Sequence, residues 1–229
     1  MDLKKLFYPR SIAVVGASPN LGGGKLPFYQ VLLNAGYGGE LYPVNPKHKE
    51  IKGVTVFSSL DELPDGIDLA ICSVPSRLAL QTLETAVKKR IRFVHFFTSG
   101  FSEIGNIELE ESLVKAARKG MTRIVGPNCI GVHCTESKVT FEPFVRQEGI
   151  GKVAFLSQSG GVTNIFMRMA HARRIELNKV VSYGNQADLR VEDYLEYFAQ
   201  DNTVMAIAGY IEDIKDGKAF GGPKGRYNT

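Results

Sequence analysis

Cysteine is scarce in this chain, and its arrangement excludes two classes of protein. The three cysteines are Cys72, Cys129 and Cys134, among 229 residues. An odd number without C-x-x-C spacing supports neither a disulfide framework nor a zinc site. We therefore expect buried free thiols, as in a protein of the reducing cytoplasm.

Long apolar runs and a strong charge of one sign are also missing. No stretch of about 18 apolar residues occurs, and no apolar segment of signal-peptide length follows Lys4 and Lys5. The formal net charge is only +4, and the basic residues are spread along the chain. The sequence therefore predicts no membrane-spanning helix and no nucleic-acid binding, although the mild positive charge suits an anionic small ligand.

Several familiar signatures of catalysis are absent. The Gly-rich stretch that follows residue 15 is neither G-x-G-x-x-G nor a P-loop, because Gly24-Lys25 is not followed by serine or threonine. Ser159 lacks the preceding glycine that a nucleophile elbow requires. No histidine shows metal-ligand spacing, so we expect no metal site. His95, within an apolar run, is interpreted as a hydrogen-bonded core residue.

What is present is a regular alternation of short apolar runs with helical segments. The composition is that of a globular protein, with 44% hydrophobic and 23% charged residues. Continuously apolar, β-branched runs are typical of strands covered on both faces. The alternation therefore predicts an α/β fold with right-handed βαβ units and a doubly wound parallel sheet. The expected strands are 11–15, 39–44, 68–74, 93–97 and 122–125, and the expected helices are 26–35, 76–90 and 107–119.

The alternation breaks at residues 136–150 and then resumes. We therefore divide the chain into a domain over 1–135, a linker over 136–150, a shorter α/β domain over 151–220 and a tail over 221–229. A second sheet of three strands would have an unpaired edge and an uncovered face, which predicts oligomerisation or disorder towards the end of the chain. The expected strands here are 152–156, 179–183 and 204–211, and the expected helices are 160–173 and 190–200.

The loops that follow the strands carry the candidate ligand-binding residues, because open α/β sheets bind ligands at the carboxyl edge. The Gly-rich turn over 16–24 would bring backbone N–H groups to a phosphate at a helix N-terminus, and a plain connecting turn is the alternative. Loops 73–76, 98–101 and 126–131 end at the same edge. The segment 157–161 (SQSGG) opens a helix in the second domain and is a second potential anion site.

The end of the second strand discriminates between cofactors. An NAD site would place a carboxylate there to accept hydrogen bonds from the ribose, and this chain has Asn45-Pro46-Lys47 instead. A basic side chain favours a phosphorylated ribose, as in NADP or coenzyme A. The alternative interpretation is a solvated loop that also contains Lys49 and Lys52.

Taken in order, these strand-end motifs resemble those of the NDP-forming acyl-CoA synthetases. ADP-forming acetate–CoA ligases look most similar, and the alpha subunit of succinyl-CoA synthetase is a more distant relative. The resemblance implies a Rossmann-type CoA-binding domain, then a truncated flavodoxin-like ligase domain. It also implies the reaction acyl-CoA + ADP + phosphate to acid + CoA + ATP. The motifs are Val15-Gly16-Ala17-Ser18, Tyr42-Pro43-Val44-Asn45-Pro46-Lys47, Ser73-Val74-Pro75, Thr98-Ser99-Gly100-Phe101, Gly126-Pro127-Asn128-Cys129-Ile130-Gly131 and Phe155-Leu156-Ser157-Gln158-Ser159-Gly160-Gly161.

The resemblance further implies roles for individual residues. Lys47 would lie near the adenosine phosphate of coenzyme A. The residues implied to hold coenzyme A are Gly16, Ser18, Pro19, Asn20, Lys47, Val74, Pro75, Phe97, Thr98 and Ser99. Those implied to cradle the phosphate that a phosphohistidine carries are Asn128, Ser157, Ser159, Gly160 and Gly161.

No histidine of this sequence aligns with the phosphorylated histidine of that family, which lies beyond the third strand of the second domain. We therefore expect no catalytic residue here and a chain that is not competent alone. ADP, ATP and Mg would bind a nucleotide-grasp domain or a beta-type partner subunit. A non-catalytic CoA-binding module remains an alternative, although it would not need the second anion loop. An NADP-dependent reductase is a further alternative, for which no hydride-transfer partner is recognisable.

Overall fold

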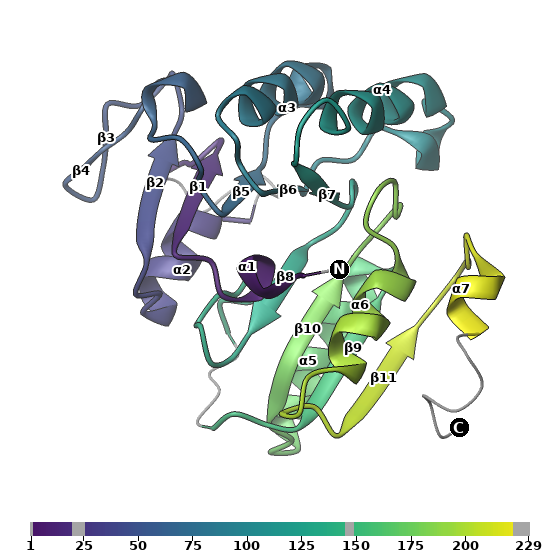
Figure 1. Cartoon of the computed structure of the whole chain (residues 1–229). Helices are drawn as coiled ribbons and strands as arrows, with labels where there is room; N and C mark the ends of the chain where they lie inside the picture. The colour runs from purple at the N-terminus through teal and green to yellow at the C-terminus, as the bar shows by residue number, and fades with distance from the viewer. Residues whose placement is uncertain (1, 20–25, 145–148, 222–229) are drawn as a thin grey trace.

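The first half of the molecule is built on a parallel sheet of five strands in the order β2-β1-β5-β6-β7 (Figure 1). The structure is a computed structural model that describes residues 2–19, 26–144 and 149–221. All five strands expected from the sequence form. Pro43 lies in the edge strand β2, where a residue without an N–H donor is tolerated. The strands are β1 (Ser11–Val15), β2 (Glu40–Val44), β5 (Leu69–Cys72), β6 (Phe93–Phe96) and β7 (Arg123–Val125).

Helices cover both faces of this sheet, which makes it doubly wound as predicted. Helix α2 (Phe28–Ala35) packs on one face, and α3 (Ala79–Lys88) and α4 (Ile107–Ala117) pack on the other (Figure 1). Alternate residues of β1 therefore enter two different cores: Ile12 and Val14 pack towards α2, and Ala13 and Val15 pack towards α3 and α4. Both faces are buried, which explains why the strands are continuously apolar.

Short elements connect these strands and helices. A two-stranded hairpin lies beyond β2, and three 3-10 turns precede β5, α3 and α4. They are α1 (Lys4–Phe7), β3 (Glu50–Ile51), β4 (Val54–Thr55), η1 (Leu60–Glu62), η2 (Ser76–Leu78) and η3 (Ser102–Ile104).

The second sheet differs from the expectation, because it has four strands in the order β11-β9-β10-β8. Strands β9 (Val153–Ser157), β10 (Leu177–Ser182) and β11 (Ala206–Tyr210) are the three expected parallel strands. The additional strand β8 (Gly131–Cys134) pairs antiparallel with β10. The sequence places residues 131–134 in the first domain and does not predict this strand, because an antiparallel partner about 45 residues away leaves no local periodicity in a four-residue segment.

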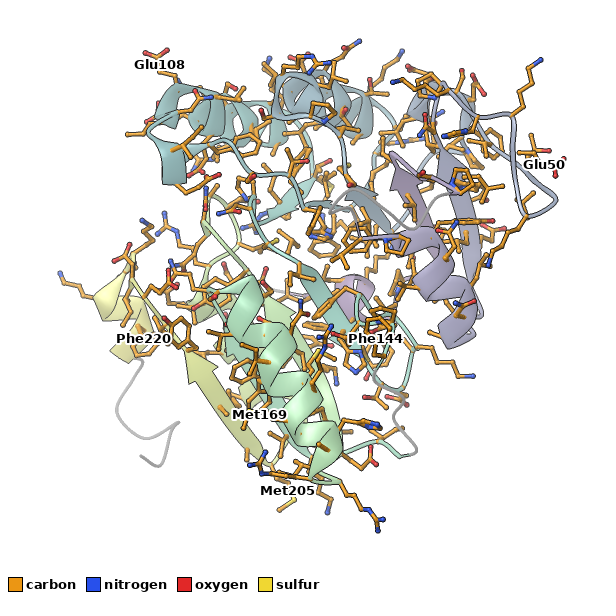
Figure 2. All side chains as sticks on the ribbon, turned by 180° about the vertical axis from the view of Figure 1, so that it is seen from behind. Glu50, Glu108, Phe144, Met169, Met205 and Phe220 are labelled. Carbon is orange, nitrogen blue, oxygen red and sulfur yellow. The ribbon has the colours of Figure 1, made fainter. Side chains whose placement is uncertain are left out.

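Two helices cover opposite faces of this second sheet, so the expected uncovered face is limited to the region of β11, whose residues are exposed or half-buried. Helix α6 (Val191–Ala199) lies in front of the sheet in Figure 1 and α5 (Gly160–Ala172) lies behind it; α7 (Gly217–Gly221) follows β11. Figure 2 shows Met169 on the outer side of α5, where it is 48% exposed. Exposed backbone and side chains remain at β11, whose outer edge has no strand beside it among the described residues.

The expected linker also differs, because part of it is buried. Val139 and Phe141 belong to the hydrophobic core that the two halves share. Helix α1 joins the same core, since the Phe7 ring stacks on Tyr197 of α6 at 5.1 Å between ring centroids. The hydroxyl of Ser137 donates to the carbonyl oxygen of Phe7 at 2.6 Å. The described parts of the two halves are therefore packed together through segments 4–7 and 137–142. Among the described helices, none is long and apolar enough to cross a membrane.

Candidate functional site

Two adjoining cavities lie at the carboxyl ends of the strands, where ligands bind in open α/β sheets. The first has a volume of about 420 Å³ and lies between the ends of β1, β2 and β5. The second has a volume of about 850 Å³ and lies between the ends of β5 and β6 and the start of α5. Ser73, Val74 and Pro75 line both of them. These two adjoining cavities are together called the groove below, and each volume suits a small-molecule site.

The wall of the first cavity depends on the close approach of two strand ends. Gly16 follows β1 with φ +89°, and a Cβ atom there would lie 2.5 Å from the carbonyl oxygen of Ser73. The backbone N–H of Gly16 donates to the carbonyl oxygen of Val44 at 2.8 Å. Asn45 holds the neighbouring loops, because its amide donates to the carbonyl oxygen of Ala17 at 2.7 Å and its Oδ1 accepts from the N–H of Lys47 at 3.0 Å.

Two basic side chains line this first cavity. Lys47 follows β2, and Arg77 lies in the 3-10 turn after β5. Both are exposed, and neither has an ion-pair partner among the residues that the structure describes. Asp61 also lines the cavity, but its carboxylate pairs with Lys88 at 3.3 Å. The first cavity can therefore accept an anionic group.

The second cavity contains the N-terminus of α5. Ser159 is the N-cap residue, and its hydroxyl accepts from the N–H of Val162 at 3.3 Å. Ser157 is buried beneath the turn, where its hydroxyl donates to the carbonyl oxygen of Ser159 at 2.8 Å. The first-turn N–H groups of Gly160 and Gly161 have no acceptor within a helix, and both residues line the cavity. Such N–H groups attract anions, as do the partial positive charges of a helix N-terminus.

Asn128 lies across this cavity from α5 and has a left-handed backbone conformation, with φ +57°. Its side-chain Nδ2 is 3.3 Å from Oδ1 of Asn185. Its backbone N–H donates to the carbonyl oxygen of Thr98 at 2.9 Å. The loop after β7 is therefore attached to the loop after β6 through Thr98 and to the second half of the chain through Asn185. Residues from both halves of the chain line this cavity.

A buried histidine supports the Asn128 loop from below. His95 of β6 is 3% exposed, and its Nε2 is 3.0 Å from the carbonyl oxygen of Cys129, to which the neutral ring donates. Burial lowers the pKa of His95 to about 4, although this hydrogen bond acts in the opposite direction. Burial also raises the pKa of the Cys129 thiol. Both groups are neutral near pH 7, so they provide structure rather than charge, as predicted for His95. The described residues contain no group of three or more potential metal ligands.

The groove brings together most of the residues that the sequence singled out. Ser18 and Pro19 are described but line neither cavity, Ser157 is buried beneath the second, and Asn20 lies outside the described residues. The binding role of each residue remains a prediction. The first cavity is lined by Gly16, Lys47, Val74 and Pro75, and the second by Val74, Pro75, Phe97, Thr98, Ser99, Asn128, Ser159, Gly160 and Gly161.

Sequence reasoning missed three lining or supporting residues, and it gave Gln158 no role beyond its place in the predicted anion loop 157–161. Asn45 was noted only as part of a motif, and its position at a strand end next to proline was the available signal. Arg77 follows Val74-Pro75 by two positions, and a cation so close to a strand end could have been selected. Gln158 and Glu212 both line the second cavity, and the Gln158 Oε1 accepts from the N–H of Glu212 at 2.9 Å. No local signal connects two residues so far apart.

Comparison with known families divides the chain between residues 135 and 150. Residues 10–135 match the family model of a CoA binding domain, and residues 150–222 match the succinyl-CoA ligase like flavodoxin domain. These matches confirm the α/β class, the two-part organisation and the resemblance to acyl-CoA synthetases. They support coenzyme A as the cofactor of this chain.

Individual relatives give the same result. The ADP-forming acetate–CoA ligase of Methanocaldococcus jannaschii is 38% identical over 94% of this chain and 30% of its own length. The subunit alpha of ADP-forming acetate–CoA ligase I of Pyrococcus furiosus is 39% identical over 96% of this chain and 49% of its own length. In the apo structure of the dinucleotide forming acetyl-coenzyme A synthetase 1 of Ca. Korarchaeum cryptofilum, the TM-score is 0.89 at 37% identity, over 96% of this chain and 48% of that one. The chain thus spans half or less of the length of these relatives.

Proposed function

Because this chain belongs to the CoA binding domain family, we propose that it is the CoA-binding, alpha-type part of an ADP-forming acyl-CoA synthetase. The observation that carries the proposal is the pair of adjoining cavities at the carboxyl edge of the first sheet, one with a basic end beside Lys47 and the other with the N-terminus of α5. A ligand with phosphates at one end and a reactive thiol or thioester at the other fits this division.

The proposed binding mode places the adenosine 3′-phosphate of coenzyme A beside Lys47. The shared wall of Ser73, Val74 and Pro75 would contact the middle of the ligand. The pantetheine arm would then reach the second cavity past Thr98, whose hydroxyl is held by the carbonyl oxygen of Val74. Apolar walls with a few polar groups are typical of such cofactor sites.

The second cavity would hold the phosphate that moves between the acyl group and the nucleotide. The N–H groups of Gly160 and Gly161 and the side-chain amide of Asn128 supply donors, and none of the described residues that line this cavity is a lysine or arginine. Neutral donors at a helix N-terminus bind phosphate without neutralising it, so the phosphate can be both bound and passed on.

The complete reaction is acyl-CoA + ADP + phosphate to acid + CoA + ATP. We propose that this chain contributes the CoA site and one side of the phosphate site to it. The phosphohistidine segment would belong to a longer alpha-type chain, and the nucleotide-grasp domain would lie either in that chain or in a beta-type partner subunit. The name of the Pyrococcus furiosus relative, which is a subunit alpha, supports a partner subunit.

Calorimetric titration of the purified chain tests the cofactor and its orientation. We expect coenzyme A to bind more tightly than dephospho-CoA and NADPH not to bind. The substitution Lys47→Ala should weaken binding of coenzyme A by about twofold to fivefold, the range for an exposed ion pair, and leave binding of dephospho-CoA unchanged. Lys49→Ala is the matched control, because Lys49 is exposed on the same loop and does not line the cavity.

Other outcomes would contradict particular parts of the proposal. Binding of NADPH without coenzyme A would favour the reductase and would refute CoA binding. An equal loss of affinity for coenzyme A and dephospho-CoA in Lys47→Ala would show that Lys47 does not contact the 3′-phosphate.

A further inference from the structure

The segment after β10 connects the two halves of the chain beside the phosphate-type cavity. Residues 185–189 run alongside β7 and the loop that follows it. The N–H groups of Asn185, Ala187 and Leu189 donate to the carbonyl oxygens of Pro127, Gly126 and Ile124 at 3.0, 3.0 and 3.2 Å. Backbone hydrogen bonds therefore hold Asn185 next to Asn128.

The side chain of Asn185 is surrounded by acceptors from the first half of the chain. Its Nδ2 is 2.6 Å from Oε2 of Glu103 and 2.8 Å from Oε2 of Glu110. The Ser102 Oγ, which donates its own proton to Glu110, is a third and more distant acceptor at 3.2 Å. The two carboxylates are anchored in turn, because Glu103 also accepts from the N–H of Gly100 and Glu110 accepts from the N–H of Ser102. The two nearest acceptors, both carboxylate oxygens, thus match the two hydrogens of one amide.

The polarity of these hydrogen bonds determines the orientation of a second amide. An ionised carboxylate can only accept, so the NH₂ group of Asn185 must face Glu103 and Glu110. Its Oδ1, which can only accept, then faces Asn128. Asn128 must therefore direct its NH₂ group towards Asn185, which leaves its second N–H available to the cavity.

From this geometry we infer that Asn185 is a positioning residue that fixes the side-chain amide of Asn128 in the cavity. The inference rests on the proposed function, in which that amide contacts the phosphate. An amide free to rotate would present either its oxygen or its NH₂ group to the ligand, and an oxygen would repel phosphate. The pair Glu103 and Glu110 excludes the wrong orientation from a distance, through one intervening amide.

The backbone beside Asn185 is equally constrained. Gly184 has φ +53°, and a Cβ atom there would lie 2.3 Å from the carbonyl oxygen of Pro127 and 2.4 Å from that of Asn128. No larger residue fits without moving the two loops apart. The short contact is therefore part of what brings Asn185 within reach of Asn128.

NMR of the ¹⁵N-labelled chain tests the inference directly. The side-chain amide signal of Asn128 is assigned from its loss in Asn128→Ala. In Asn185→Ala we expect this signal to move towards the shifts of an exposed asparagine. Addition of inorganic phosphate should also shift this signal. The phosphate affinity of Asn185→Ala obtained from that shift should be about threefold to tenfold weaker than that of the unsubstituted chain, the effect of one hydrogen bond. Asn185→Leu, which keeps the size but removes the oxygen that accepts from Asn128, should give the same change.

Asn202→Ala removes an exposed asparagine in the turn before β11 and should leave the Asn128 signal and the phosphate response unchanged. An unaltered Asn128 signal in Asn185→Ala and Asn185→Leu, with both proteins folded, would overturn the inference. If phosphate does not displace the signal in the unsubstituted chain, the proposed phosphate site is wrong. The comparison of signals without phosphate still decides the role of Asn185 in that case.

Discussion

Gly16 is the residue whose substitution should most directly link backbone geometry to ligand binding. It combines a left-handed backbone, φ +89°, with a close approach to Ser73, whose carbonyl oxygen and carbon would lie 2.5 and 3.0 Å from an added Cβ atom. Ser73 itself is held to β1, because its N–H donates to the carbonyl oxygen of Val15 at 2.8 Å. In Gly16→Ala the end of β5 must therefore move away from β1.

The expected cost has two parts. A left-handed conformation costs an alanine about 1–2 kcal/mol, and overpacking against a fixed backbone adds about 1–3 kcal/mol. Gly16→Ala should thus lower the free energy of unfolding by about 2–5 kcal/mol. Gly53→Ala is the matched control, because Gly53 has φ +79° with nothing within 4 Å of its Cβ position, so only the first part applies.

Urea denaturation followed by circular dichroism measures both costs, and calorimetry measures affinity for coenzyme A. We expect Gly16→Ala to be the more destabilised protein and to bind coenzyme A more weakly, because Ser73, Val74 and Pro75 form the wall shared by both cavities. Gly53→Ala should bind normally. Equal destabilisation by the two substitutions, or normal binding in Gly16→Ala, would refute the role assigned to the close approach.

Two further predictions concern buried ionisable groups. Lys179 is 1% exposed and its Nζ lies 2.7 Å from Oδ2 of Asp201, so Asp201→Ala should cost about 3–5 kcal/mol by leaving a buried charge unpaired. Lys179→Met should lower the free energy of unfolding far less, because it leaves no buried charge. Urea denaturation measures both variants, and a larger loss in Lys179→Met than in Asp201→Ala would contradict this prediction. The lowered pKa of His95, about 4 against 6.5, means that its neutral form stabilises the fold above pH 6.5 and that this stability is lost as the pH falls towards 4. Denaturation between pH 4 and 7 should show a smaller pH dependence in His95→Gln, and an identical dependence in both proteins would contradict the burial of a neutral ring.

The first sheet could be predicted almost completely because its information is local. Each of its strands is an apolar run, and each run ends at glycine, proline or a polar loop. The carboxyl edge then follows from parallel topology alone, so that residues from five distant loops could be assigned to one edge. This is why Lys47, Val74 and Asn128, far apart in the sequence, were selected together and lie along one groove.

The second sheet was predicted less well, for a physical reason. Strand β8 is four residues long and pairs antiparallel with a strand that follows it by more than 40 residues. Its stability comes from that pairing and from burial in the shared core, not from its own sequence. For the same reason residues 136–150 had the composition of a linker, although Val139 and Phe141 are buried.

The sequence by itself determined the α/β class, the order of the strands along the chain and the loops that carry chemistry, because apolar periodicity and turn residues act over a few positions. Only the tertiary structure decided which side chains complete those loops. Arg77 reaches the cavity beside Lys47, and Asn185 joins Glu103 and Glu110 to Asn128. Such contacts depend on hydrogen-bond polarity between segments distant in the chain, which no local pattern records.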